Sequence, residues 1–221
     1  MTGTPVRILL ARHGETLFNV EGRWQGQADS PLTERGLAQA GELGRALSTE
    51  AIAAVYSSDL GRAMQTAQEV AVFHGLTVSP DVRLREIETG GFTLKNWAEI
   101  DAEYPGQREI WAKAPATLRM PGGETLLEAQ TRALAFVAEV MPRHVDQTIV
   151  VISHGGIGQA ILINAMGGTV DDLWFTERVD NCQISRLEWT PADGLKLVEL
   201  SDVRHLEEVG SLRKWRTTDA A

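Results

Sequence analysis

The sequence predicts an α/β fold of three layers, αβα, with a mostly parallel central sheet and a small cap inserted over one end of it. Short apolar runs alternate along the chain with longer segments of helical spacing, the order that covers both faces of a parallel sheet with helices. Two β-like runs then close the pattern. A length of 221 residues suits one compact domain, 1–221, that carries an insertion.

Four apolar runs are predicted to form parallel strands. Each is bounded by turn residues and is too short to be a helix. They lie at Val6–Ala11, Ala53–Tyr56, Leu76–Val78 and Thr148–Ile152.

The first long helix is predicted to begin after Thr33, whose hydroxyl can cap free backbone N–H groups, and to end near Ser48. Helical spacing then turns one set of apolar side chains inward. This set is Leu37, Ala40, Leu43 and Leu47.

Two further helices follow the same reasoning. One is capped by Ser58 or Asp59 and ends at His74, where Gly75 supplies a left-handed stop. The other covers Thr125–Met141, with Leu127, Leu134 and Val137 among its apolar positions, and Pro142 stops it.

The remaining segments are a hairpin and the cap. Asn181–Ser201 contains two β-like runs joined across Pro191–Gly194, which predicts a terminal hairpin. Between about residues 87 and 123 the periodicity is poor, and Gly, Pro and Trp accumulate. We expect this cap segment, residues 87–123, to lie over one end of the sheet.

Composition narrows the function classes. The 21 Lys and Arg residues against 30 Asp and Glu give a formal charge of −9, which argues against nucleic acid or an anionic membrane as partner. A single cysteine excludes an intramolecular disulfide and a cysteine metal cluster. The N-terminal apolar stretch is too short for a signal peptide, so a cytoplasmic protein is expected. A homo-oligomer is compatible with the sequence.

Two histidines follow predicted strands directly. Arg12 and His13 come after the first strand, and His154 follows Ser153 at the end of the last parallel strand. Ligands of open α/β sheets bind at the carboxyl ends of the strands. If these two strands are neighbours, both imidazoles lie at the same edge.

A further cation and a carboxylate are expected there. Arg62 lies in the first turn of its helix, where the helix dipole disfavours a cation unless an anion lies nearby. Two arginines, two histidines and helix N-termini together favour a tetrahedral oxyanion such as phosphate. Glu86 is the candidate for proton transfer, although a solvated ion pair with Arg83 or Arg85 is the alternative.

These motifs, in this order, resemble the histidine phosphatase superfamily, also called the phosphoglycerate mutase-like family. The resemblance covers about residues 6–202. It is carried by Arg12-His13-Gly14-Glu15-Thr16, Asn19, Gly22 to Gly26, Leu32-Thr33-Glu34-Arg35-Gly36, Ser57-Ser58-Asp59-Leu60-Gly61-Arg62, Leu84-Arg85-Glu86-Ile87, Pro121-Gly122-Gly123-Glu124-Thr125 and Ser153-His154-Gly155-Gly156.

The resemblance implies a metal-independent phosphomonoester hydrolase of the histidine acid phosphatase type, without a cofactor, acting on a small phosphorylated metabolite. His13 would take the phosphoryl group as phosphohistidine. Glu86 would protonate the leaving oxygen and then activate water. The phosphate oxygens would be held by Arg12, Arg62 and His154, with Asn19 and Gly155 assisting. An attacking imidazole must be neutral, so a backbone carbonyl or another acceptor should hold the proton of its other nitrogen.

The chain departs from the family's pattern after Glu86, at Gly90–Trp97, where many relatives have a Gly-x-Trp-Glu-Gly-like stretch. The rival functions are a cofactor-dependent phosphoglycerate mutase and a non-catalytic phosphate-binding protein. The cap segment is short and has no basic excess, which favours hydrolysis of a monoester over retention of a bisphosphate. The aromatic side chains Trp24, Trp97, Tyr104 and Trp111 could line an apolar leaving-group pocket or simply pack.

Overall fold

The computed structural model describes residues 4–175 and 178–210 and has a six-stranded sheet at its centre. The strand order is β3-β2-β4-β1-β5-β6. The first four in this order pair in parallel, and β5 and β6 complete the sheet in antiparallel fashion. The strands are β1 (Val6–Arg12), β2 (Ile52–Ser57), β3 (Val78–Pro80), β4 (Thr148–Ser153), β5 (Ile184–Thr190) and β6 (Gly194–Asp202).

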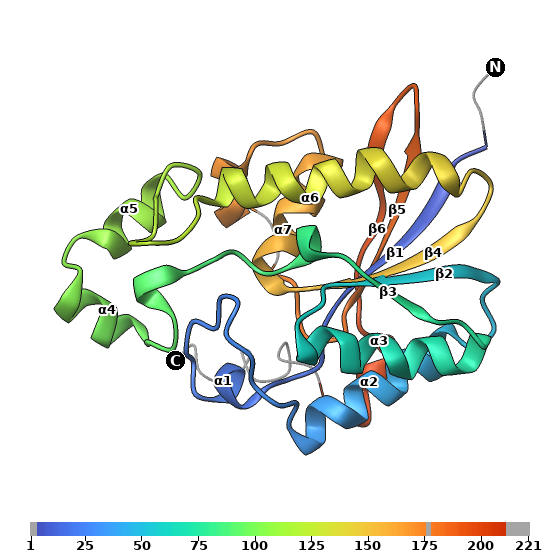
Figure 1. Ribbon diagram of the computed structural model, residues 1–221, viewed down its shortest axis with the longest axis horizontal. Coiled ribbons are helices and arrows are strands. Elements are labelled where there is room, and N and C mark those ends of the chain that lie inside the picture. Colours follow the sequence, from blue (N-terminus) through green and yellow to red (C-terminus); the bar gives the residue numbers. More distant parts are fainter. Residues whose placement is uncertain (1–3, 176–177, 211–221) are drawn as a thin grey trace.

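Helices cover both faces of the sheet, as the αβα prediction requires (Figure 1). On one face lie α2 (Glu34–Leu47) and α3 (Gly61–His74), and on the other lie α6 (Leu126–Val140) and α7 (Gly155–Ala165). The short helices are α1 (Leu17–Val20), α4 (Trp97–Glu103) and α5 (Gln107–Lys113). Short 3-10 turns lie at Val82–Leu84, Gly90–Phe92, Met141–Arg143, Val170–Phe175 and Arg204–Leu206.

The side chains of β1 alternate between the two layers because successive residues of a strand point to opposite faces. Ile8 and Leu10 pack in the core that contains α6 and α7. Leu9 and Ala11 pack in the core that contains α2 and α3. Both faces of this strand are therefore buried, which explains why its sequence is a continuous apolar run.

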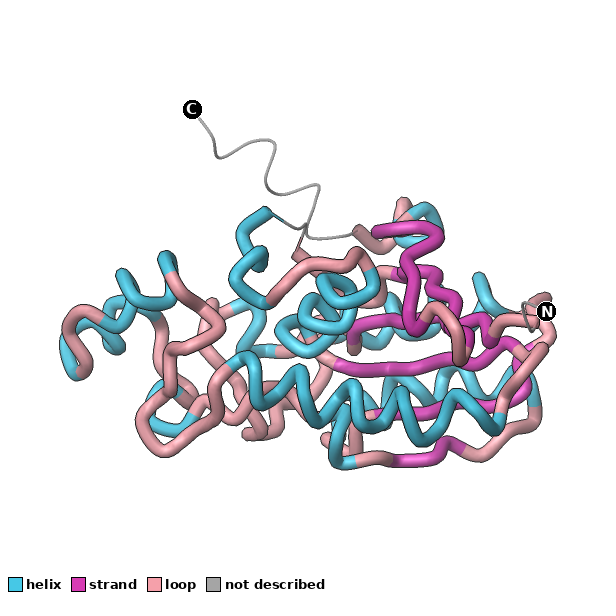
Figure 2. The backbone as a smooth tube through the Cα atoms, turned by 90° about the horizontal axis from the view of Figure 1, so that it is seen from above, coloured by secondary structure: helices cyan, strands magenta, loops and turns pink. Residues whose placement is uncertain are grey.

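The cap segment supplies the extension at one end of the molecule. Helices α4 and α5 project beyond the carboxyl ends of the parallel strands, at the left of Figure 1 and in the perpendicular view of Figure 2. Phe92, Ile100 and Trp111 of this segment are nevertheless buried and join the core on the α6 side. The cap segment is thus packed onto the sheet layers through apolar side chains.

Three predicted details were wrong. The strand expected at Leu76–Val78 begins only at Val78, because Leu76 N–H still donates to Ala71 O across the left-handed Gly75. Helix α3 is flanked by Leu60 without a side-chain cap, so neither Ser58 nor Asp59 is its N-cap. Leu37 was placed inward and Leu127 on the apolar side of its helix, yet both are exposed.

The other predicted elements were confirmed. Thr33 caps α2, and its hydroxyl accepts a hydrogen bond from Gly36 N–H. Thr125 caps α6 in a capping box with Glu128. The terminal hairpin is β5 and β6, and α3 ends at His74, where Gly75 is in the left-handed conformation as predicted. Within the described ranges, no helix has the length and apolar character to cross a membrane.

Two leucines of α2 differ in burial, so replacing them should change the stability of the protein by different amounts. Leu43 is fully buried between the helix and the sheet, whereas 42% of Leu37 is exposed. Leu43→Ala should lower the free energy of unfolding by about 2–5 kcal/mol because it leaves a cavity, and Leu37→Ala by less than about 0.5 kcal/mol. Urea denaturation measures both. Equal losses would contradict this assignment of the buried helix face.

Candidate active site

The site is built where β1 and β4 lie side by side. The two strands pair in parallel with Arg12 opposite Ser153, so the residues that follow them emerge together. His13 N–H donates to Ser153 O at 3.0 Å, and the His13 and His154 rings lie 5.1 Å apart, centroid to centroid, at 60°. The strands are neighbours, and both imidazoles lie at one sheet edge.

His13 has a defined tautomer. Its Nδ1 lies 2.7 Å from Gly14 O, and because a carbonyl only accepts, Nδ1 carries the proton. Nε2 is then left with its lone pair and faces Arg62 Nε at 3.3 Å. The backbone acceptor expected from the sequence is therefore Gly14 O.

Both histidines are held in the neutral form. Burial lowers the pKa of His13 well below its usual value, and the neighbouring Arg12 and Arg62 lower it further. Burial likewise lowers the pKa of His154, again with help from Arg62. Neither ring nitrogen of His154 has a hydrogen-bond partner in residues 4–175 and 178–210.

The two arginines are fixed mainly by backbone carbonyls. Arg62, which is buried, donates to Ala28 O and Gly26 O, each at 2.8 Å, and Arg12 donates to Val179 O at 2.8 Å. Carbonyls orient a guanidinium without cancelling its net charge. The positive charge thus remains available for an anion in the cavity.

Arg62 lies at the start of α3, as predicted, but the anion that this position needs comes from the chain itself. The Asp29 carboxylate accepts from Gly61 N–H at 2.9 Å and from Arg62 N–H at 3.4 Å, and it lies 3.5 Å from Arg62 Nη1. It compensates the helix N-terminus that Leu60 leaves uncapped. Asp29 stands outside every recognisable motif of catalytic type, which is why sequence reasoning missed it.

Glu86 is held at the start of α7. Its carboxylate accepts from Gly156 N–H at 2.9 Å, Ile157 N–H at 3.1 Å and Ile87 N–H at 3.0 Å. Arg83 pairs with Asp81 and Glu139, and Arg85 pairs with Asp59. The alternative partners considered for Glu86 are therefore engaged by other carboxylates.

The remaining predicted residues take two kinds of position. Gly155 is the first residue of α7 and lies against the Arg12 guanidinium. Asn19 lines the cavity, but its side-chain oxygen is occupied by Thr16 N–H and by Asn181 Nδ2. Asn181 also donates to His13 O at 2.8 Å, a brace that the sequence did not reveal.

Most of the predicted site residues border one cavity of about 400 Å³, but His154 is fully buried beside His13 and does not line it. Arg12, His13, Arg62 and Glu86 line its polar part. Trp24, Trp97 and Trp111 line it as well, and Trp24 makes edge contacts with the other two at 5.2 and 5.4 Å between centroids. The cavity thus joins a cationic cradle to an aromatic wall, a combination suited to a phosphate ester with an apolar body.

Comparison with known proteins agrees with this geometry. Residues 8–202 match the model of the histidine phosphatase superfamily (branch 1). A probable phosphoglycerate mutase, GpmB, of Salmonella choleraesuis is 33% identical over 91% of this chain and 95% of its own length. Phosphoserine phosphatase 1 of Hydrogenobacter thermophilus is 36% identical over 76% of this chain and 80% of its own length. The solved structure of Bacillus stearothermophilus YhfR has a TM-score of 0.86 and 32% identity, covering 91% of this chain and all of that one.

The neutral buried histidines predict a pH-dependent stability. Below about pH 6.5 an unfolded histidine takes up a proton that folded His13 and His154 do not, so the free energy of unfolding falls as the pH drops. Each histidine contributes at most about 1.4 kcal/mol per pH unit. His154→Gln should therefore flatten the decline between pH 7 and 5, measured by urea denaturation. A decline as steep as in the unaltered protein would contradict the assignment.

Proposed function

The chain belongs to the histidine phosphatase superfamily, and we propose that it is a metal-independent phosphomonoester hydrolase that acts through a phosphohistidine on a small phosphorylated metabolite. The observation that carries the proposal is the state of His13. Its Nδ1–H is held by Gly14 O, and its unprotonated Nε2 faces the cradle made by Arg12 and Arg62.

In the first step, His13 Nε2 attacks phosphorus in line while the bond to the ester oxygen breaks. Glu86 gives its proton to that oxygen, so the leaving group departs as a neutral alcohol. Arg12 and Arg62, which line the cavity, hold the equatorial oxygens and stabilise their charge. We assign a third contact to His154, whose ring lies 5.1 Å from that of His13 and whose ring nitrogens have no hydrogen-bond partner among the described residues. The imidazole and phosphoryl group now form a phosphohistidine.

In the second step, a water molecule attacks the same phosphorus from the side that the alcohol left. Glu86, now a carboxylate, takes a proton from this water as the new P–O bond forms and the P–Nε2 bond breaks. The products are inorganic phosphate, free His13 and a protonated Glu86. The cycle closes without an external reductant, oxidant or second phosphate donor.

The ion pairs made by three cations of the cap segment favour hydrolysis over the mutase reaction. Lys95 Nζ donates to Gly91 O and pairs with Glu103, and Arg108 pairs with Asp101 and lies over the Trp97 ring. Arg119 pairs with Glu128. These three side chains are engaged by neighbouring carboxylates and do not line the cavity. Two arginines outside the cradle, Arg23 and Arg178, do line it, and Arg23 is paired with Glu21 and Glu99. The second phosphate of a bisphosphate would need further cations from the cap segment.

Replacing the two reacting groups tests the chemistry. His13→Ala should abolish release of inorganic phosphate from an aryl phosphate, and no alkali-stable phosphoprotein should be trapped. Glu86→Gln should lower kcat by about 10²–10⁴-fold with little effect on phosphate binding, because the cradle is intact. Arg62→Ala, in contrast, should weaken phosphate binding. Activity that survives His13→Ala would remove the nucleophile from the proposal.

A substrate panel separates hydrolase, mutase and phosphate-binding protein. Phosphate release and phosphoglycerate isomerisation are followed in parallel for aryl phosphates and 3-phosphoglycerate, with and without a bisphosphate primer. We expect release without isomerisation, and a KM for aryl phosphates that rises about fivefold in Trp97→Ala, for an aromatic contact of about 1 kcal/mol. Trp189→Ala in β5 is the control. Primer-dependent isomerisation would make the protein a mutase, and binding without turnover would make it a phosphate-binding protein.

A further inference from the structure

The segment that carries Glu86 has almost no regular secondary structure to hold it. After the turn at Val82–Leu84 the chain runs as an irregular loop through residues 85–89. Backbone carbonyls in such a loop need other partners, or they are left without hydrogen bonds. The partners found here are side chains, and most of them belong to one residue.

That residue is Arg132, on α6. Its Nη1 donates to Arg83 O at 2.8 Å and to Arg85 O at 2.7 Å, and its Nη2 donates to Glu86 O at 2.9 Å. Ser153 Oγ donates to the one carbonyl that remains in this run, Leu84 O, at 2.8 Å. The carbonyls of four consecutive residues, 83–86, are thus fixed by side chains from α6 and from the end of β4.

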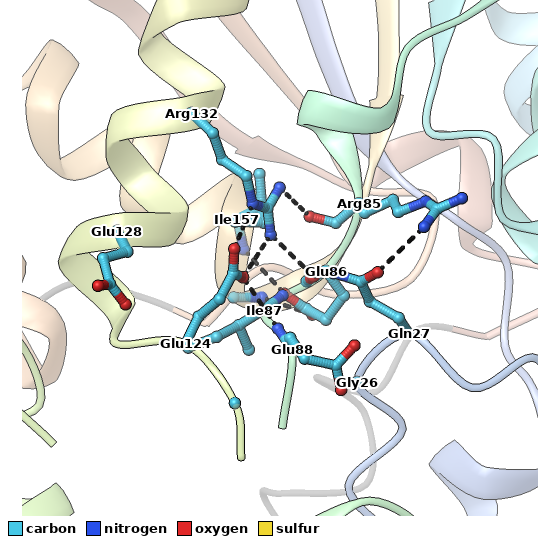
Figure 3. Close-up of polar contacts among 12 residues, drawn as sticks. Gly26, Gln27, Arg85, Glu86, Ile87, Glu88, Glu124, Glu128, Arg132 and Ile157 are labelled. Carbon is cyan, nitrogen blue, oxygen red and sulfur yellow. Dashed lines mark hydrogen bonds and ion pairs between the residues drawn. The ribbon is translucent and has the colours of Figure 1, made fainter. Parts of the chain in front are cut away.

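The other donors of Arg132 are taken by Glu124. Nε lies 2.9 Å from Glu124 Oε1, and Nη2 lies 2.9 Å from Glu124 Oε2 (Figure 3). A guanidinium has five N–H donors in a fixed fork, and these five bonds use all of them. Lysine, with three donors on a flexible stem, could not reproduce this arrangement.

Glu124 itself holds the other side of the same loop. Its Oε2 accepts from Glu88 N–H at 3.0 Å, and its own N–H donates to Glu88 O at 2.8 Å. Burial alone would raise the pKa of Glu124, but the hydrogen bonds from Arg132 and Glu88 N–H outweigh burial and lower it. Glu124 is therefore ionised at neutral pH, and its ion pair with Arg132 persists.

Neither residue lines the cavity, and all five donors of Arg132 are engaged by Glu124 and by backbone carbonyls, so neither is placed to bind the ester. We propose that Arg132 and Glu124 are positioning residues, which fix the backbone on both sides of Glu86 so that its carboxyl group meets the leaving oxygen. The inference rests on the proposed function, because it assigns Glu86 the transferred proton. Arg132, together with Gln27 Nε2 at 3.3 Å, holds the Glu86 carbonyl. The carboxylate is held by two N–H groups of α7 and by Ile87 N–H of the same loop, so the position of the backbone bears directly on the carboxylate.

The test uses two esters of nearly equal size whose leaving groups differ in acidity, phenyl phosphate and p-nitrophenyl phosphate. Phenol needs the proton from Glu86 much more than p-nitrophenol does. Arg132→Lys should lower kcat/KM, which reports the steps up to departure of the alcohol, about tenfold for phenyl phosphate, with a much smaller loss for p-nitrophenyl phosphate and a nearly unchanged affinity for inorganic phosphate. Glu86→Gln should show the same selectivity with a larger loss.

Two further variants make the result decisive. Glu124→Gln keeps the side-chain shape but removes the ion pair, and it should show the same selectivity, so it carries the test if Arg132→Lys does not fold. Arg143→Lys, in the 3-10 turn that follows α6, is the matched control that should change hydrolysis of neither ester. Within the described residues Arg143 pairs with the exposed Glu139. Thermal unfolding of each variant confirms that the compared proteins are folded.

The outcomes distinguish the positioning role of Arg132 and Glu124 from the proposed function on which it rests. A selective loss on phenyl phosphate supports the positioning role, because a generally loosened structure would slow both esters alike. If the variants lose equally on both esters, or lose nothing, the positioning role is overturned. The proposed function still stands in that case, provided that the unaltered protein hydrolyses the esters. An unaltered protein that hydrolyses neither ester overturns the proposed function, and this inference with it.

Discussion

The parallel pairing of β1 with β4 is the constraint on which the candidate site depends. It places Arg12 opposite Ser153, and the backbone bond from His13 to Ser153 O continues the pairing one residue beyond β1. A shift by one residue would turn each side chain to the opposite face of the sheet. Alternate side chains of β1 fill the two apolar cores, and such a shift would exchange them. The packing of the cores therefore fixes the same register that brings the two histidines together.

The electrostatics of the cradle follow from which groups hold its charges. One backbone carbonyl holds Arg12, and two backbone carbonyls hold Arg62. Asp29 lies 3.5 Å from Arg62 Nη1. Burial lowers the pKa of both imidazoles and the same positive charge lowers it further, so both stay neutral, as a nucleophile must be. A cavity that concentrates cations and excludes protonated histidine is well matched to a phosphate dianion, whose charge would compensate both arginines at once.

Sequence patterns predicted the parts of this architecture that rest on local chemistry. The apolar runs, the caps at Thr33 and Thr125 and the strand-end histidines each depend on neighbouring residues, and the structure has them as expected. Leu37 and Leu127 show where periodicity fails: each lies in the first turns of its helix and is exposed, while the residue before it, Gly36 or Leu126, is buried. Asp29, Asn181 and Arg132 could not be foreseen, because each acts on a residue more than 30 positions away and carries no motif. Contacts of that kind are created by the tertiary fold and leave no period in the sequence.

The two ends of the cap segment meet. Gly91 N–H donates to Pro121 O at 2.7 Å, and Glu88 and Glu124 are joined backbone to backbone just outside that bond. Closing a longer or shorter loop between fixed ends changes the entropy only slowly with length. The length of the cap segment and its exposed positions can therefore vary between residues 91 and 121 while these bonds keep its two ends joined. The buried side chains, such as Phe92 and Ile100, must keep their apolar character. Substitutions at these exposed positions, in evolution or by design, would alter the wall that meets the leaving group and leave the residues at the ends of the parallel strands unchanged.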